Sequence, residues 1–207
     1  MIPLVHDLAN KSIVVFGGGE VGTRKARVFS TEAKVTVVAK EFTEDLKQMD
    51  LTLRETVLSK EEDVHEIIET LGNPFLAVTA TGIPELDEMI AEVSREKGLL
   101  VNKTSGEIGD VITPSIIDRD PVIIAITTQG SSPAMSKYLR KKLGPLLDKS
   151  SLMVELQSEL RDELKGHPDR EELLWEVIED EKVWEAFEED YDKGKKLAYE
   201  VIEADEN

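Results

Sequence analysis

The first hundred residues alternate between short apolar runs and longer stretches in which apolar residues recur at helical spacing. The short runs are rich in valine and isoleucine, which is typical of buried strands. The predicted strands are Ser12–Phe16, Lys34–Ala39, Leu51–Val57, Phe75–Thr81 and Leu99–Val101, and the predicted helices begin near Thr23 and cover Glu41–Met49, Ser59–Leu71 (with Ser59 as the N-cap) and Pro84–Lys97. This alternation predicts an α/β fold with a Rossmann-like, doubly wound parallel sheet.

After Asn102 the pattern changes, and beyond Lys149 leucines recur at every fourth position, which predicts helices to near the end of the chain. Between these points the predicted elements are the loop Lys103–Asp110, the strand Pro121–Thr127, the turn Gln129–Pro133 and the basic helix Ala134–Leu147. We therefore expect a Rossmann domain over residues 1–113, a connecting segment over residues 114–147 and a small all-helical domain over residues 148–207.

Three glycines follow the first strand with the spacing G-x-G-x-x-G. Gly17, Gly19 and Gly22 come directly after a strand and open a helix, and a second strand follows within about 30 residues, as a dinucleotide site requires. The first glycine permits the tight turn, the second lets a pyrophosphate approach the backbone, and the third lets helix and strand pack closely. The backbone N–H groups of Glu20 and Val21 then face the phosphates. Alternatively, such a turn only packs the βαβ unit.

Two further positions complete the predicted cofactor site. Many dinucleotide sites have an acidic residue at the end of the second strand, where it binds the adenosine ribose. Here Lys40 occupies the end of that strand, and Glu41 comes slightly late. Lys40 can bind a 2′-phosphate, so this position is compatible with both NAD and NADP. Thr81, at the end of the fourth predicted strand, is the other expected cofactor contact.

Composition excludes several classes of protein. The chain has no cysteine, which excludes disulfides, thiolate metal sites and cysteine nucleophiles. His6, His65 and His167 are scattered, so no metal-ligand spacing is visible. No apolar run reaches the length needed to span a bilayer, and the first residues do not resemble a signal peptide. We therefore expect a cytoplasmic protein that binds no membrane.

The net charge of −18 argues against nucleic acid as a partner. The charge is concentrated at the end of the chain, since residues 151–207 contain twenty acidic and seven basic residues. Such a segment is usually a solvated helix face.

Several short motifs, in order over about 140 residues, resemble the precorrin-2 dehydrogenase family, which also forms the N-terminal part of siroheme synthases. The motifs are Val15–Ala26 (Val-Phe-Gly-Gly-Gly-Glu-Val-Gly-Thr-Arg-Lys-Ala), Val35–Ala39, Thr79–Thr81, Val101-Asn102, Pro114–Arg119 and Gly130–Pro133. The resemblance implies NAD-dependent oxidation of precorrin-2 to sirohydrochlorin in siroheme biosynthesis. It also implies a homodimer formed around residues 114–147, and a helical domain that helps to cover the tetrapyrrole.

The predicted basic helix fits such a substrate, because precorrin-2 carries eight carboxylates. Lys137, Arg140 and Lys141 recur three and four residues apart on one face. Alternatively, this face is merely solvated or forms a dimer contact. In the family, the serine that matches Ser132 lies at the tetrapyrrole site, although Ser132 is equally suited to cap the helix.

The chain departs from the family at its favoured acid/base. The family usually has Val-Val-Asp after Val-Asn, whereas this chain has Ser105 in place of that aspartate and one residue fewer before Pro114. A serine hydroxyl is not a general base unaided. Asp110 or Glu107 in the same loop can substitute for it. Dehydrogenation depends chiefly on positioning, so we expect oxidation to persist and metal insertion to be poor.

Two other functions compete with this interpretation. A dinucleotide-sensing module with a helical partner-binding tail would have no need of the Pro114–Arg119 and Gly130–Pro133 motifs. A dehydrogenase of another small substrate is disfavoured because no catalytic Lys, His or Tyr motif is apparent.

Overall fold

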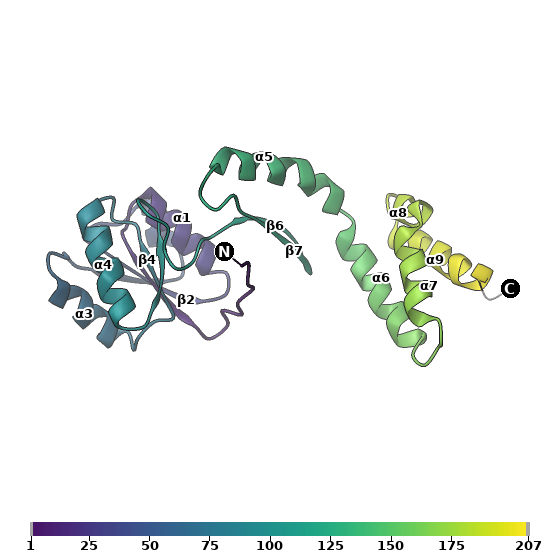
Figure 1. Ribbon diagram of the computed structural model, residues 1–207, viewed down its shortest axis with the longest axis horizontal. Coiled ribbons are helices and arrows are strands. Elements are labelled where there is room, and N and C mark those ends of the chain that lie inside the picture. The colour runs from purple at the N-terminus through teal and green to yellow at the C-terminus, as the bar shows by residue number, and fades with distance from the viewer. Residues whose placement is uncertain (1, 206–207) are drawn as a thin grey trace. The chain divides into compact units, whose positions relative to one another are not determined.

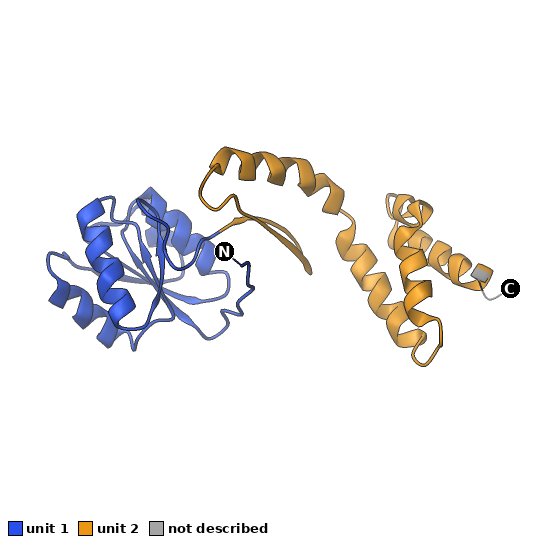
Figure 2. Ribbon diagram, in the orientation of Figure 1, with its two compact units in different colours: residues 1–113 blue, residues 114–207 orange. Residues whose placement is uncertain are grey.

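The computed structural model describes residues 2–205. The chain divides into two compact units, Met1–Thr113 and Pro114–Asn207 (Figure 2).

The first unit is built on one parallel sheet (Figure 1). Its strands lie in the order β3-β2-β1-β4-β5, and they are β1 (Ser12–Phe16), β2 (Lys34–Ala39), β3 (Thr52–Glu55), β4 (Leu76–Thr79) and β5 (Leu100–Lys103). Strand β1 pairs with both β2 and β4. The winding of the chain therefore reverses between β1 and β4, and sheets of this kind bind ligands beyond the carboxyl ends of the strands at that point.

Helices cover both faces of this sheet, namely α1 (Glu20–Phe29), α2 (Glu44–Gln48), α3 (Glu61–Thr70) and α4 (Pro84–Glu96). Val14 and Phe16 of β1 pack in one core cluster with residues of α3 and α4. Ile13 and Val15 pack in the other, with Ala26 of α1. Successive side chains of a strand point to opposite faces, and here both faces are buried. This explains why β1 has a continuous apolar sequence.

The second unit begins with an antiparallel hairpin of β6 (Ser115–Arg119) and β7 (Val122–Ile126). After it come α5 (Pro133–Leu143), the 3₁₀ helix η1 (Gly144–Leu147), α6 (Ser150–Glu163), α7 (Arg170–Glu179), α8 (Glu181–Ala186) and α9 (Tyr191–Asp205). Helices α6 to α9 share one core, in which Leu156 and Leu160 of α6 are fully buried. The periodic leucines of the sequence therefore form the inner face of α6.

The predicted α/β class, parallel sheet and helical C-terminal part are confirmed, but some boundaries differ. Helix α1 begins at Glu20 and not near Thr23, because the turn ends at Gly19, which is the N-cap. The helix predicted over Ala134–Leu147 is α-helical only as far as Leu143. Pro145 has no N–H for an α-helical hydrogen bond, and the chain tightens there into η1.

One local prediction was wrong, and one strand was missed. Ser59 is not the N-cap of α3, since Lys60 holds that position. The backbone N–H and the hydroxyl of Ser59 instead donate to the Asp63 carboxylate, at 3.0 and 3.1 Å. No strand was predicted over residues 115–119, which form β6. Pairing with β7, and not the pattern of residues 115–119, makes that segment extended.

Candidate functional site: a dinucleotide cavity at the switch point of the sheet

The turn between β1 and α1 is too closely packed for side chains at three of its glycines. Gly17 has φ +127°, and a Cβ atom there would lie 2.0 Å from the carbonyl oxygen of Ala80. A Cβ at Gly18 would lie 2.0 Å from the carbonyl oxygen of Glu41, and one at Gly22 would lie 1.9 Å from that of Gly17. These contacts are with backbone atoms and cannot be relieved by a side-chain rotation. The fold itself therefore requires all three glycines.

Gly19 differs from its neighbours. A Cβ atom there would meet nothing within 4 Å, and its φ of −81° and ψ of −171° suit any residue. Gly19 is the N-cap of α1, so it has no side chain with which to bind the first N–H groups of the helix. Together with the helix dipole, these N–H groups attract phosphate. The missing side chain keeps the approach to them open.

Two threonines hold this turn against the loop after β2. The hydroxyl of Thr23 donates to the carbonyl oxygen of Gly19 at 2.8 Å and lies 2.8 Å from the hydroxyl of Thr43. Because Thr23 donates its only hydroxyl proton to the carbonyl oxygen of Gly19, Thr43 is the donor in the bond between the two hydroxyls. The N–H of Thr43 also donates to the carbonyl oxygen of Gly18 at 3.0 Å. Sequence reasoning missed both threonines, because their pairing depends on the packing of two loops.

A cavity of about 590 Å³ opens beside the turn, within the range of small-molecule sites. Its walls are the Gly17–Gly19 turn, residues 38–43 after β2, residues 56–58 after β3, and Thr81, Ile83 and Leu86 beyond β4. The predicted residues that line it are Gly17, Gly19, Lys40, Glu41 and Thr81. Glu20 and Val21 do not line it but form the exposed first turn of α1, and Gly22 is buried beneath that turn.

A buried carboxylate lies behind the Thr81 wall. Asp87, in the first turns of α4, is 1% exposed. It accepts hydrogen bonds from the N–H of Thr81 at 2.9 Å, from the hydroxyl of Thr81 at 2.7 Å and from the hydroxyl of Ser105 at 3.2 Å. Ser105 itself is exposed. Sequence reasoning selected Thr81 and Ser105 but missed Asp87, because an aspartate early in a helix reads as an ordinary helix-start residue.

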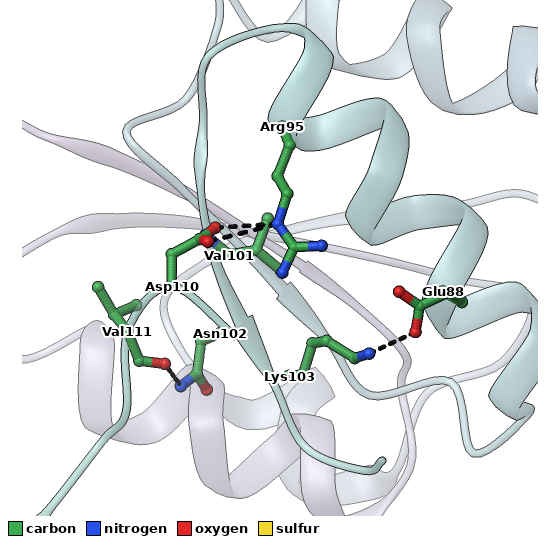
Figure 3. Close-up of polar contacts among 7 residues, drawn as sticks. All are labelled: Glu88, Arg95, Val101, Asn102, Lys103, Asp110 and Val111. Carbon is green, nitrogen blue, oxygen red and sulfur yellow. Dashed lines mark hydrogen bonds and ion pairs between the residues drawn. The ribbon is translucent and has the colours of Figure 1, made fainter. Parts of the chain in front are cut away.

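Asp110, the other predicted catalytic residue, holds the loop that follows β5 (Figure 3). Its carboxylate accepts from Arg95 Nε, with both oxygens at 3.3 Å, and from the N–H of Val101 at 3.0 Å. Beside it, Asn102 Nδ2 donates to the carbonyl oxygen of Val111 at 2.8 Å. These bonds fasten the returning loop to β5. Asp110 therefore has a structural task, and its catalytic role stays a prediction.

Two lysines near this loop are in unusual settings. Lys103 is 5% exposed at its side chain and pairs with Glu88, and its hydrogen bond holds the pKa of Glu88 below the ordinary range. Lys25 in α1 donates to the hydroxyl of Thr113 at 2.9 Å. Burial, and then the nearby charge of Arg24, lower the pKa of Lys25 to about 8. Neither lysine was singled out from the sequence.

The predicted substrate residues lie in the second unit. Ser132 is the N-cap of α5 and accepts from the N–H of Met135 at 3.2 Å, so its capping role is realised. The side chains of Lys137, Arg140 and Lys141 border a shallow depression on α5. These three residues form no ion pair with an acidic side chain among residues 2–205. Their charges are thus available to an anionic ligand.

The part of the chain that the structure describes shows neither a metal site nor a membrane-spanning helix. No group of three or more acidic or histidine side chains in residues 2–205 is placed to hold a metal ion. No helix in the same range is both long and apolar enough to cross a membrane.

The fold and the cavity define a dinucleotide-binding protein of the Rossmann type. A family model described as "Putative NAD(P)-binding" matches residues 4–115. The precorrin-2 dehydrogenase of Methanosarcina barkeri is 38% identical over 97% of this chain and 93% of its own length. The chain belongs to the precorrin-2 dehydrogenase family, which confirms the resemblance seen in the sequence.

Two other relatives define how far the similarity extends. The siroheme synthase of Buchnera aphidicola is 33% identical over 89% of this chain, but the match covers only 37% of that longer protein. Among solved structures, SirC, a precorrin-2 dehydrogenase, matches this chain with a TM-score of 0.71 and 22% sequence identity. The match covers 98% of this chain and 100% of SirC. The similarity to SirC shows that the fold is shared.

The contrast among the glycines generates the first prediction. Gly19→Val should fold normally, because the space around its Cβ is empty. The new side chain would obstruct the N–H groups at the start of α1, and NAD affinity should fall at least about 100-fold, or roughly 2.7 kcal/mol. Isothermal titration calorimetry with NAD measures this, and circular dichroism checks the fold. Gly72→Val, at a glycine with free space around it and outside the cavity lining, controls for a general effect of valine, although its φ of +73° adds backbone strain. Unchanged NAD affinity in folded Gly19→Val would contradict the assignment.

Proposed function

We propose that the protein oxidises precorrin-2 to sirohydrochlorin in siroheme biosynthesis, with NAD as the hydride acceptor. The observation that carries this proposal is the 38% identity to a precorrin-2 dehydrogenase over nearly the full length of both chains. The glycine turn and its cavity support it, because a pyrophosphate needs the close backbone approach that Gly19 permits. A cytoplasmic location is part of the proposal, since the reaction draws on the NAD pool of the cell.

The chain's own residues have separable tasks in this reaction. The N–H groups at the start of α1 bind the pyrophosphate, and the loop after β2, with Lys40 and Glu41, faces the adenosine ribose. NAD itself supplies the nicotinamide ring that accepts the hydride. Thr81, on the opposite wall of the cavity, orients the cofactor beyond β4. Positioning of this kind supplies much of the barrier reduction when no covalent intermediate is needed.

Ser132, Lys137, Arg140 and Lys141 are proposed to bind the carboxylates of the tetrapyrrole. The three basic side chains are exposed, whereas most of the chain's surface charge is negative. A local positive surface lowers the cost of bringing a polyanionic substrate to a protein of net charge −18. Residues 148–207 would then help to cover the bound macrocycle.

The direct test is anaerobic mixing of the protein with precorrin-2 and NAD. We expect the absorption of sirohydrochlorin and of NADH to rise together. Lys137→Gln with Lys141→Gln should raise KM for precorrin-2 several-fold and leave KM for NAD unchanged, because surface charges of this kind act on substrate capture. Lys196→Gln with Lys193→Gln, on α9, is the matched control for loss of two charges. No oxidation by the unmodified protein would refute the proposed function.

Metal insertion is proposed to be weak. Ser105 stands where the family's usual carboxylate would assist removal of the two pyrrole protons, and a hydroxyl, even with its hydrogen bond to Asp87, can pass on only one proton at a time. Iron insertion into sirohydrochlorin, followed spectroscopically, should barely exceed the spontaneous rate. Rapid iron insertion by the unmodified protein would overturn this proposal without affecting the one on oxidation.

A homodimer formed through residues 114–147 is also proposed. This segment exposes large apolar side chains, of which Ile123 is 59% and Leu146 is 74% exposed. Sedimentation at micromolar concentration should give about twice the 23.1 kDa of one chain. Ile123→Glu should shift the equilibrium to monomer, because a charge buried at an interface is costly. Val28→Glu, at an exposed apolar residue of α1, should not. A monomer in the unmodified protein would exclude the dimer.

A further inference from the structure

Asp87 is a buried carboxylate. It is 1% exposed, and it forms no ion pair with a basic side chain among residues 2–205. Burying a charge is expensive unless hydrogen bonds compensate for it. The three hydrogen bonds from Thr81 and Ser105, together with the start of α4, provide that compensation. Asp87 is thus a buried carboxylate whose oxygens are held by Thr81 on one side and by Ser105 on the other.

The partners of Asp87 place this charge beside the cofactor cavity. Thr81 lines the cavity, and Ser105 is an exposed residue that follows β5. Strands β4 and β5 are neighbours in the sheet, with Thr79 opposite Lys103. Asp87 therefore joins a wall of the cavity to a solvent-facing hydroxyl at the same edge of the sheet.

The direction of the hydrogen bond determines what that hydroxyl can do. Ser105 donates its single hydroxyl proton to Asp87 at 3.2 Å, because an ionised carboxylate only accepts. The free lone pairs of Ser105 Oγ then face away from Asp87. Toward a ligand at this edge, Ser105 is an acceptor.

The other acids of the loop are less suited to the same task. The carboxylate of Asp110 already accepts hydrogen bonds from Arg95 Nε and from the N–H of Val101. Glu107 is exposed, and an exposed carboxylate has no fixed orientation toward a reacting atom. Of Asp87, Asp110 and Glu107, Asp87 alone combines burial, fixed geometry and a bonded hydroxyl that is exposed.

We propose that Ser105 is the catalytic proton acceptor of the oxidation, and that Asp87 is the positioning residue that orients Ser105 and takes up its proton. This inference rests on the proposed function.

Oxidation of precorrin-2 removes two hydrogens, one as a hydride from carbon to NAD and one as a proton from the macrocycle. The proton passes to Ser105 Oγ while the hydroxyl proton of Ser105 passes to Asp87 Oδ2. The electron pair of the broken bond to hydrogen stays in the macrocycle as part of its new double bond. Asp87 returns its proton to water after the product leaves.

The deciding variant is Asp87→Asn. The amide oxygen can still accept both hydrogen bonds from Thr81, so the cavity wall and NAD affinity should be unchanged. The amide nitrogen donates to Ser105 Oγ, which turns the hydroxyl from an acceptor into a donor. In single-turnover oxidation of precorrin-2, the rate should fall about 10²–10⁴-fold, as for loss of an acid/base group. Ser105→Ala should lose as much, and the double variant should lose no more than either single variant.

Two further readouts separate this role from a structural one. The single-turnover oxidation rate of the unmodified protein should show a deuterium solvent isotope effect, because the exchangeable hydroxyl proton of Ser105 moves to Asp87 in the reacting step, and this effect should vanish in Asp87→Asn and Ser105→Ala. Asp87→Asn combined with Ser105→Asp puts a carboxylate directly at the surface position and should recover most of the rate. Glu85→Gln, at an exposed carboxylate in the first turn of the same helix, is the control for loss of a carboxylate and should keep the isotope effect.

The proposal is overturned if Ser105→Ala oxidises precorrin-2 within about threefold of the unmodified rate, a loss too small for an acid/base group. That variant removes only an exposed hydroxyl, so it tests the idea even if Asp87→Asn does not fold. It is also overturned if Asp87→Asn loses NAD affinity but keeps its rate at saturating NAD, since Asp87 then only supports the cavity wall. Failure of the unmodified protein to oxidise precorrin-2 would instead refute the proposed function itself.

Discussion

The first unit depends on one close approach of backbone to backbone, where the turn after β1 passes against the end of β4. The N–H of Ala80 donates to the carbonyl oxygen of Phe16 at 2.8 Å, and the carbonyl oxygen of Ala80 occupies the place that a Cβ of Gly17 would take. On its other side, the N–H of Gly17 donates to the carbonyl oxygen of Val38 at 2.9 Å. The turn is therefore held between β4 and β2. This sets where α1 begins and leaves the cofactor cavity between the same two strand ends.

Polar contacts, and not apolar packing, hold the segments that follow β4 and β5 at the carboxyl edge of the sheet. Asp110 and Asn102 fasten the loop after β5, and Asp87 ties Thr81 to Ser105. Hydrogen bonds to a charged group contribute about 1.5–3 kcal/mol net each, but the cost of burying the charge offsets much of this gain. The carboxylate at position 87 therefore holds Thr81 and Ser105 together at a modest net gain in stability. The network's main effect is to fix the orientation of a few polar groups at the carboxyl edge of the sheet, beside the cofactor cavity.

The sequence was most informative where local rules govern the structure. Buried strands, the G-x-G-x-x-G turn and the leucine spacing of α6 each follow from residues close together in the chain, and the fold class followed from them. Strand β6 was not predictable in this way, because it becomes extended only by pairing with β7.

The candidate site residues divide in the same way, into those that a local pattern indicates and those that depend on tertiary packing. Gly17, Gly19 and Thr81 were found from a motif and a strand end, whereas Asp87 becomes notable only when α4 brings it under Thr81 and Ser105. Asp110 was selected as an unassigned loop acid, and only the structure reveals that Arg95 and the Val101 N–H already occupy it.

The unequal constraint on the four glycines has a consequence for evolution. A descendant of this chain that no longer needed a dinucleotide would still be obliged to keep Gly17, Gly18 and Gly22, because each is pressed against backbone carbonyl groups. It would be free to replace Gly19, because a Cβ atom at that position would meet nothing within 4 Å. In a collection of related sequences, three of these glycines thus report ancestry of the fold, and drift at the position of Gly19 marks the lineages that have abandoned the cofactor.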